Sequence, residues 1–171
     1  HGIEKKRGGG TIRVCADVKD GCLVVQVADD GCGMTKEQLE RLSDPFFTTR
    51  TTRKVGLGVP FLRMLAEQTG GYVEIKSRSE KEHADHGTEL TAVFREDSID
   101  FIPLGDIVST VVTLIQGSPD VDFLFTHTAP GVNVRLDTSE IREVLGEDVP
   151  LSVPEVLAWI RESLEEQYRQ K

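Results

Sequence analysis

The sequence predicts a two-layer α/β fold (an α+β sandwich), in which helices cover one face of a mixed β-sheet. Two pairs of apolar stretches, within residues 11–28 and 72–94, have the length and composition of strand pairs. Stretches with apolar residues at helical spacing lie between and after them. Alternation is typical of a half-buried strand, and an apolar stripe is typical of a helix that packs on a sheet.

The first strand pair follows residues 1–10, which are basic and glycine-rich and predict a loose lead-in. Residues 11–18 alternate between apolar and polar, whereas residues 22–28 are more apolar and therefore predict a more central strand. Asp20-Gly21 between them is the signal of a tight hairpin turn. We therefore expect an antiparallel hairpin here.

A short helix is predicted next, because Thr35 and Gln38 have the spacing of a capping box. Asp44-Pro45 ends it, since the residue before a proline disfavours helical backbone. Residues 46–56 show no periodicity and predict a mobile loop.

A second helix is predicted from Gly58 to Gly70-Gly71, which supplies a glycine C-cap. Strands are then expected at residues 72–77 and 88–94, joined by a charged loop. The apolar face of this helix is predicted to consist of Leu57, Phe61, Leu62, Leu65 and Ala66.

Residues 98–171 predict a C-terminal extension with the element order αββαα, beside a main domain at residues 1–97. A helix is expected at residues 104–116, either docked on the sheet or presenting a surface to a partner. Two strands, a short helix and a last helix that begins near Pro154 follow. The inward face of the last helix is predicted to be Val156, Leu157, Ile160 and Leu164.

Composition restricts the class of protein. The 171 residues suffice for one good core, and 38% hydrophobic with 29% charged residues is ordinary for a globular chain. A net charge of −9 argues against nucleic acid and anionic membranes as partners. No apolar run approaches membrane-spanning length. Three cysteines without a C-x-x-C motif predict reduced thiols and a cytoplasmic location.

The first functional motif is Asp29-x-Gly31-x-Gly33, at the end of an apolar strand. A carboxylate at a strand end supplies an acceptor, and spaced glycines let the backbone approach a ligand closely. The alternative is a simple strand-terminating turn, in which Asp and Gly are common.

The second motif is a basic loop that leads into a helix. Arg50, Arg53 and Lys54 precede Gly56-Leu57-Gly58, and the free N–H groups at a helix start favour phosphate. The loop would then be a nucleotide lid. The alternative is a solvated basic loop.

Together these motifs resemble the nucleotide site of the GHKL superfamily, whose Bergerat fold occurs in histidine kinases, gyrase-type topoisomerases, mismatch-repair ATPases and ninety-kilodalton chaperones. Asp29-x-Gly31-x-Gly33 resembles the adenine-binding D-x-G-x-G. The stretch D-P-F-F-T-T-R at residues 44–50 resembles a histidine-kinase segment, and Gly87-Thr88 resembles the closing G-T. Residues 54–59 resemble G-T-G-L-G-L, with Lys and Val in place of the first Gly-Thr.

The resemblance implies that the chain binds ATP with Mg²⁺. Asp29 would accept a hydrogen bond from the adenine amino group, and Thr88 would close the pocket beside the base or be an ordinary strand threonine. The binding residues it implies are Asp29, Gly31, Gly33, Met34, Arg50, Arg53, Lys54, Gly56, Leu57, Gly58 and Thr88. His83 and His86 have too short a spacing and no partner cluster, so no metal ligand is assigned.

GHKL enzymes carry a helix before the first hairpin, with an Asn that helps to hold Mg²⁺ and an acidic residue that acts as base. The only asparagine here is Asn133, in the extension. We therefore expect a fragment of a longer chain, or a protein that obtains this element from elsewhere, and assign no catalytic residue.

Three functions remain open. The first is an ATP-binding module of histidine-kinase type that supports phosphoryl transfer or ATP hydrolysis in the intact parent, with a protein phosphoacceptor in trans. The second is an ATP-driven conformational switch of mismatch-repair type. The third is a non-catalytic module for nucleotide sensing or partner binding. A homodimer is compatible with these readings.

Overall fold

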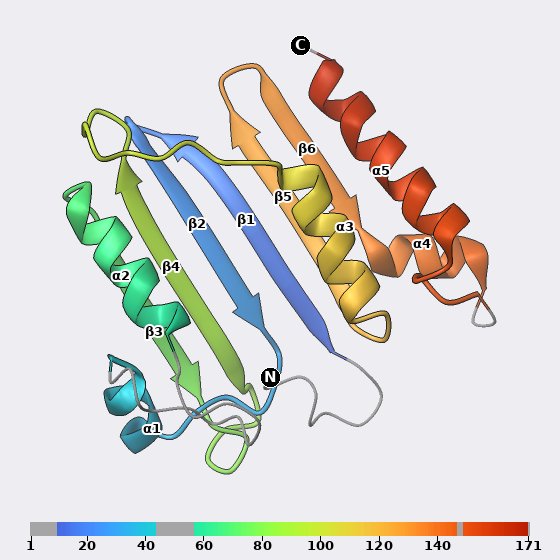
Figure 1. Ribbon diagram of the computed structural model, residues 1–171. Helices are drawn as coiled ribbons and strands as arrows, with labels where there is room; N and C mark the ends of the chain where they lie inside the picture. Colours follow the sequence, from blue (N-terminus) through green and yellow to red (C-terminus); the bar gives the residue numbers. More distant parts are fainter. Residues whose placement is uncertain (1–9, 44–56, 147–148, 171) are drawn as a thin grey trace.

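The structure is a computed structural model that describes residues 10–43, 57–146 and 149–170. Six strands form one mixed sheet in the order β3-β4-β2-β1-β5-β6 (Figure 1). All neighbouring strands are antiparallel except β1 and β5, which are parallel. The strands are β1 (Thr11–Lys19), β2 (Cys22–Asp29), β3 (Tyr72–Arg78), β4 (Gly87–Arg95), β5 (Asp122–Ala129) and β6 (Val132–Asp137).

The β1–β2 hairpin has the turn that the sequence predicts. Lys19 pairs with Cys22, so Asp20 and Gly21 form a two-residue turn. Their φ angles are +52° and +71°. Two successive positive φ values are what a tight turn between right-twisted strands requires, and Asp-Gly supplies them at low cost.

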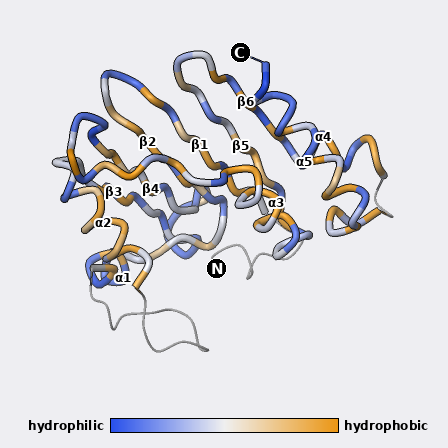
Figure 2. Tube along the Cα trace, turned by 45° about the horizontal axis from the view of Figure 1, so that its top comes forward, coloured by the Kyte–Doolittle hydropathy of each residue, from blue (hydrophilic) through white to orange (hydrophobic). Residues whose placement is uncertain are grey.

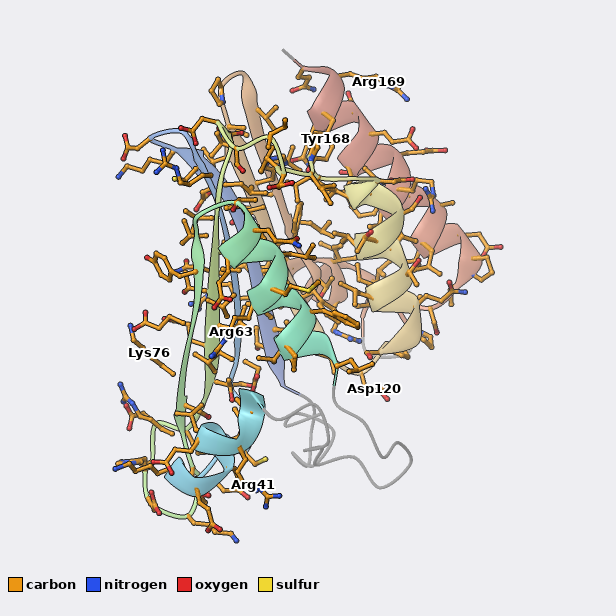
Figure 3. The ribbon with its side chains drawn as sticks, turned by 60° about the vertical axis from the view of Figure 1, so that its left-hand side comes forward. Arg41, Arg63, Lys76, Asp120, Tyr168 and Arg169 are labelled. Atoms are coloured by element: carbon orange, nitrogen blue, oxygen red, sulfur yellow. The ribbon has the colours of Figure 1, made fainter. Side chains whose placement is uncertain are left out.

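The described helices all lie on one face of the sheet, as predicted. In the edge-on view of Figure 3 they lie to one side of the strands, while Lys76 projects from the other side. The helices are α1 (Lys36–Glu40), α2 (Gly58–Gln68), α3 (Ile107–Gly117), α4 (Thr138–Leu145) and α5 (Pro154–Arg169). A 3₁₀ turn, Arg41–Ser43, follows α1. The two-layer α/β fold and the αββαα order after residue 98 are confirmed.

Local capping explains where the helices begin. Gln38 N donates to Thr35 Oγ1 at 3.3 Å, and Thr35 N donates to Gln38 Oε1 at 3.0 Å, which is the predicted capping box. The helix predicted from residue 104 begins at Ile107 instead, because the Asp106 carboxylate caps it by accepting from Ser109 N at 2.9 Å.

The main core lies between α3, α5 and the β5–β6 half of the sheet. The predicted inward face of α5 is confirmed, since Val156, Leu157, Ile160 and Leu164 are all buried. Helix α3 docks on the sheet through Ile115, which is fully buried, and its neighbours. Figure 2 accordingly colours α3 mainly apolar, whereas the C-terminal end of α5 is hydrophilic.

Helix α2 has the predicted apolar face, but that face is only partly buried. Ala66 is fully buried, but Leu57, Phe61 and Leu65 are 43%, 52% and 38% exposed. Val27, on the helix-covered side of β2, is also 36% exposed. The apolar face is present, but within the described residues no element covers the strip between α2 and α3.

The three cysteines are free thiols, as the sequence predicts. Within the described ranges, no helix is both long enough and apolar enough to cross a membrane.

Candidate functional site

Asp29 is the last residue of β2 and lies on the side of the sheet that the helices cover, directly opposite Thr88 of β4. Its Oδ1 accepts a hydrogen bond from Gly31 N at 2.9 Å, which closes a tight turn after the strand. Among the described residues, the other oxygen, Oδ2, has no hydrogen-bond partner. The turn therefore fixes the carboxylate while leaving one acceptor oxygen for a ligand.

A row of polar side chains crosses the sheet from Asp29. Thr88 is opposite Asp29, and Ser77 of β3 is opposite Thr88, with 2.9 Å between the two hydroxyl oxygens. Ser77 Oγ also donates to the Gly87 carbonyl at 2.9 Å and accepts from Met34 N at 2.8 Å. This single hydroxyl holds Met34 beside Thr88.

Ser77 is a site residue that the sequence analysis missed. Its signal was available, because Val73, Ile75 and Ser77 share one face of β3 and the third position replaces an apolar residue by a hydroxyl. The alternation of residues in β3 could not predict the contact between Ser77 and Met34, because Met34 is 43 positions away in sequence.

Two glycines bring backbone segments into direct contact. Gly33 has φ +60°, and a Cβ atom there would lie 1.8 Å from the Arg78 carbonyl oxygen. Gly87 has φ +144°, and a Cβ atom there would lie 2.1 Å from the Asp29 carbonyl oxygen. The ends of β2, β3 and β4 can therefore meet only because these positions lack side chains.

The segment between β3 and β4 closes over the glycine turn. His86 Nδ1 lies 2.6 Å from the Gly31 carbonyl oxygen, and Glu80 N donates to the Cys32 carbonyl at 3.0 Å. Arg78 forms an ion pair with Asp85 in the same segment. Across the described ranges, no group of three His, Cys, Asp or Glu side chains could hold a metal ion.

The start of α2 lies toward the same end of the sheet as the end of β2 (Figure 1). Among the described residues, no side chain caps this helix, whose first residue is Gly58 and whose N-cap position is Leu57. Pro60 has no N–H group, so the amides of Gly58 and Val59 are the first donors. A helix start at the same end of the sheet as a carboxylate and a hydroxyl suits a ligand with both hydrogen-bond donors and anionic groups.

Another hydrogen-bond donor without a partner among the described residues lies beneath α2. The Nε of Arg63 is buried and has no hydrogen-bond partner among the described residues. Figure 3 shows this side chain between α2 and the sheet. Of the other predicted residues, Arg50, Arg53, Lys54 and Gly56 lie outside the described residues, and their contact with phosphate stays a prediction.

The only asparagine of the chain does not belong to this site. Asn133 is in β6, the last strand of the sheet, and β1 and β5 separate that strand from β2. Its pairing with Thr128 places it on the face that the helices leave open.

The sequence pattern of the family described as histidine kinase-, DNA gyrase B-, and HSP90-like ATPase matches residues 1–98, which is more than half of the chain. The chain belongs to this family, and the resemblance to the GHKL superfamily is confirmed.

Among similar proteins, the nitrogen regulation protein NtrY of Azorhizobium caulinodans is 36% identical over 74 residues, 43% of this chain and 10% of that protein. The histidine protein kinase DivJ of Caulobacter vibrioides is 39% identical over 74 residues, 41% of this chain and 12% of that protein. Sporulation kinase C of Bacillus subtilis is 36% identical over 81 residues, 47% of this chain and 18% of that protein. The chain thus spans less than a fifth of the length of these relatives.

Two solved structures are similar to part of the chain. The catalytic domain of histidine kinase ThkA is 20% identical, with a TM-score of 0.40, over 51% of this chain and 53% of that one. The mycobacterial sensor histidine kinase MprB is also 20% identical, with a TM-score of 0.40, over 50% of this chain and 56% of that one.

Proposed function

We propose that this chain is an ATP-binding module of histidine-kinase type and that it supports phosphoryl transfer or ATP hydrolysis in its intact parent protein. The observation that carries the proposal is the Asp29 carboxylate, fixed at the end of β2 by Gly31 N with Oδ2 unpaired among the described residues. Family membership and the kinase names of several relatives support it. The phosphoacceptor would be a protein side chain supplied in trans.

The adenine end of the site would be formed by β2 and β4. Asp29 Oδ2 would accept from the adenine amino group, and Thr88 would lie beside the base. Met34, held by the bond from its backbone N–H to Ser77, would pack on the base. Gly31 and Gly33 would keep this approach free of side chains, and Gly33 also allows the turn to rest against Arg78. The residues present therefore fit an adenine.

The phosphate end would be formed by the start of α2 and the basic loop before it. The N–H groups at Gly58 and Val59 would donate to phosphate oxygens, and Leu57 and Gly56 would shape the turn. Arg50, Arg53 and Lys54 would neutralise charge and close over the nucleotide. Bound ATP would supply the phosphoryl group, and Mg²⁺ would offset its charge.

The described residues do not provide a Mg²⁺ site by themselves. Magnesium usually has few protein ligands and is held largely by water and substrate phosphates. We propose that the missing ligand comes from the Asn-bearing helix that the resemblance implies.

An apolar groove supports that part of the proposal. A cavity of about 210 Å³ lies between α3 and the strands β1, β2 and β5, and its lining includes Val14, Val25 and Leu114. Leu114 is 45% exposed. A helix seated here, between α2 and α3, would bury this strip and would lie next to Asp29. Such a helix would come from sequence outside the described residues or from another chain.

Calorimetric titration of Mg-ATP and Mg-ADP tests the adenine site. In Asp29→Asn the side-chain oxygen still accepts from Gly31 N, but an amide donor replaces Oδ2 and opposes the adenine amino group. We expect weak binding by the unchanged chain and none by Asp29→Asn. The matched control is Asp30→Asn, because its oxygen can still accept from Thr11 N and the change in charge is the same.

A second titration uses the chain joined to the Asn-bearing helix. We expect tighter binding of Mg-ATP than by the chain alone, together with slow hydrolysis or transfer. If the extended protein binds neither nucleotide, or if Asp29→Asn and Asp30→Asn bind equally well, the proposed function is wrong.

A further inference from the structure

A second cavity, of about 640 Å³, lies beside β6 at the opposite edge of the sheet from β3. Helices α4 and α5 form its walls, and none of the described candidate ATP-site residues lines it. Most of its lining is apolar, and the side chains that matter here are Leu136, Ile141, Val144, Val156 and Trp159. We call this cavity the α4–α5 groove.

Two large apolar side chains of the groove are exposed. Trp159 is 55% exposed and Val144 is 86% exposed. Tryptophan is enriched among the residues that dominate binding energy in protein interfaces. Trp159 is also the only tryptophan of the chain, which makes the groove directly observable by fluorescence.

The two walls of the groove are fixed before any partner binds. Helix α4 is held to β5 by Thr138, which is fully buried and accepts from Phe123 N at 2.8 Å, and by an ion pair between Arg142 and Asp122 at 2.8 Å. Helix α5 is held by its buried face and by a hydrogen bond between Tyr168 and His127. A preformed groove loses little conformational entropy on binding.

The rim of the groove is acidic. Asp137, Glu140 and Glu155 line it. Among the described residues, Arg135 is its only basic lining residue, and it is already bound to Glu140 at 2.8 Å and to Asp137 at 3.1 Å. Glu155 has no ion pair with the described residues. The surrounding extension has the same sign, since residues 98–171 contain 13 Asp and Glu but 5 Lys and Arg. An occupant with Lys or Arg beside its apolar face would match this charge.

The edge of β6 is partly closed to an added strand. The Arg135 N–H points out of the sheet edge and donates to Gln167 Oε1 of α5 at 2.9 Å. A segment that added itself to β6 would have to displace this bond. Side-chain insertion between α4 and α5 needs no such displacement.

We propose that the α4–α5 groove is a docking site for an amphipathic helical segment of a partner protein, with apolar side chains on one face and Lys or Arg flanking them. The apolar residues would cover Trp159 and Val144, and the basic residues would face Glu155 and Glu140. A second copy of this chain fits poorly, because the net charge of −9 opposes self-association through an acidic rim. The proposal is independent of ATP binding at the other edge of the sheet.

Fluorescence of Trp159 in the unmodified chain tests the proposal, with a short peptide of Leu and Lys at helical spacing as the probe. We expect a saturable shift of the emission to shorter wavelength. The matching Leu–Glu peptide should cause no shift, because its charge has the wrong sign. Val144→Asp places a carboxylate on the apolar contact and should weaken binding about tenfold. Since Val144 is exposed, this variant should still fold, which circular dichroism checks.

Charge-reversed variants separate the groove from general attraction between the cationic peptide and an acidic protein. Glu155→Lys should weaken binding of the peptide about fivefold. The control is Glu96→Lys, which changes the net charge by the same amount on an exposed residue after β4. Its effect on the logarithm of the affinity should be less than half that of Glu155→Lys. Three results would each overturn the proposal. They are equal effects of the two charge reversals on peptide affinity, no shift of Trp159 emission on adding the peptide, and a concentration-dependent dimer that buries Trp159 without peptide.

Discussion

His127 Nδ1 and the phenol oxygen of Tyr168 lie 2.9 Å apart, and this hydrogen bond joins the helix-covered face of β5 to the last turn of α5. Burial lowers the pKa of His127 below its ordinary value of 6.5, against a smaller opposite effect of Asp17. Burial also raises the pKa of Tyr168 to about 12. The structure therefore holds both rings in their uncharged forms.

His127 and Tyr168 make the free energy of unfolding depend on pH in two separate pH ranges. Because the pKa of His127 is lower in the folded chain, the unfolded chain takes up the proton first, and stability falls as pH drops below about 6.5. Because the pKa of Tyr168 is raised, stability falls as pH rises from about 10 to 12. Urea unfolding midpoints across pH measure both ranges. In His127→Gln the loss of stability below about pH 6.5 should shrink, and an unchanged slope would contradict the assignment.

Ser77→Ala tests the hydroxyl that joins three strand ends. The change leaves Met34 N and Thr88 Oγ1 without their partner, and we expect a loss of about 1–2 kcal/mol in the free energy of unfolding. Urea denaturation measures it. Ser98→Ala is the control, because Ser98 makes a local hydrogen bond to Asp100 N in an exposed turn and should change stability by less than about 0.5 kcal/mol.

Gly87→Ala tests the close approach of β4 to the end of β2. A methyl group 2.1 Å from the Asp29 carbonyl oxygen must displace backbone, so we expect a loss of about 3 kcal/mol or more. The comparison is Gly58→Ala, where an added Cβ atom meets nothing within 4 Å and stability should stay equal or rise slightly. Thermal unfolding measures the melting temperatures of both variants. Similar melting temperatures would contradict the close approach of β4 to the end of β2.

Thr138→Val tests a buried polar anchor of α4. The substitution keeps the shape of the side chain but removes the oxygen that accepts from Phe123 N, so a buried N–H group loses its partner. We expect a loss of about 1–3 kcal/mol. Thr113→Val, on the exposed side of α3, should cost less than about 0.5 kcal/mol, and chemical denaturation compares the two.

Local signals in the sequence predicted local structure well. The Asp20-Gly21 turn, the Thr35–Gln38 capping box and the buried face of α5 are confirmed, because each depends on residues within a few positions of one another. The one-sided covering of the sheet followed from the order of these elements.

Long-range relations could not be predicted in the same way. Periodicity shows that Ser77 faces the helices but not that it meets Met34, and it shows the apolar face of α2 but not whether another element covers it. The cap at Asp106 was missed because Leu104 continued the apolar pattern beyond the true helix start. In the candidate site, the position of Asp29 followed from its place at a strand end, whereas the contacts of His86 and Gly87 depend on the packed fold.

The parallel pairing of β5 with β1 has a consequence for how the chain is made. Strand β1 leaves the ribosome well before its second neighbour, β5, which is not complete until Ala129 has emerged. Until then one edge of β1 presents unpaired backbone groups. Contacts between such distant segments close slowly. Nascent chains stalled before residue 129 should therefore depend on chaperones.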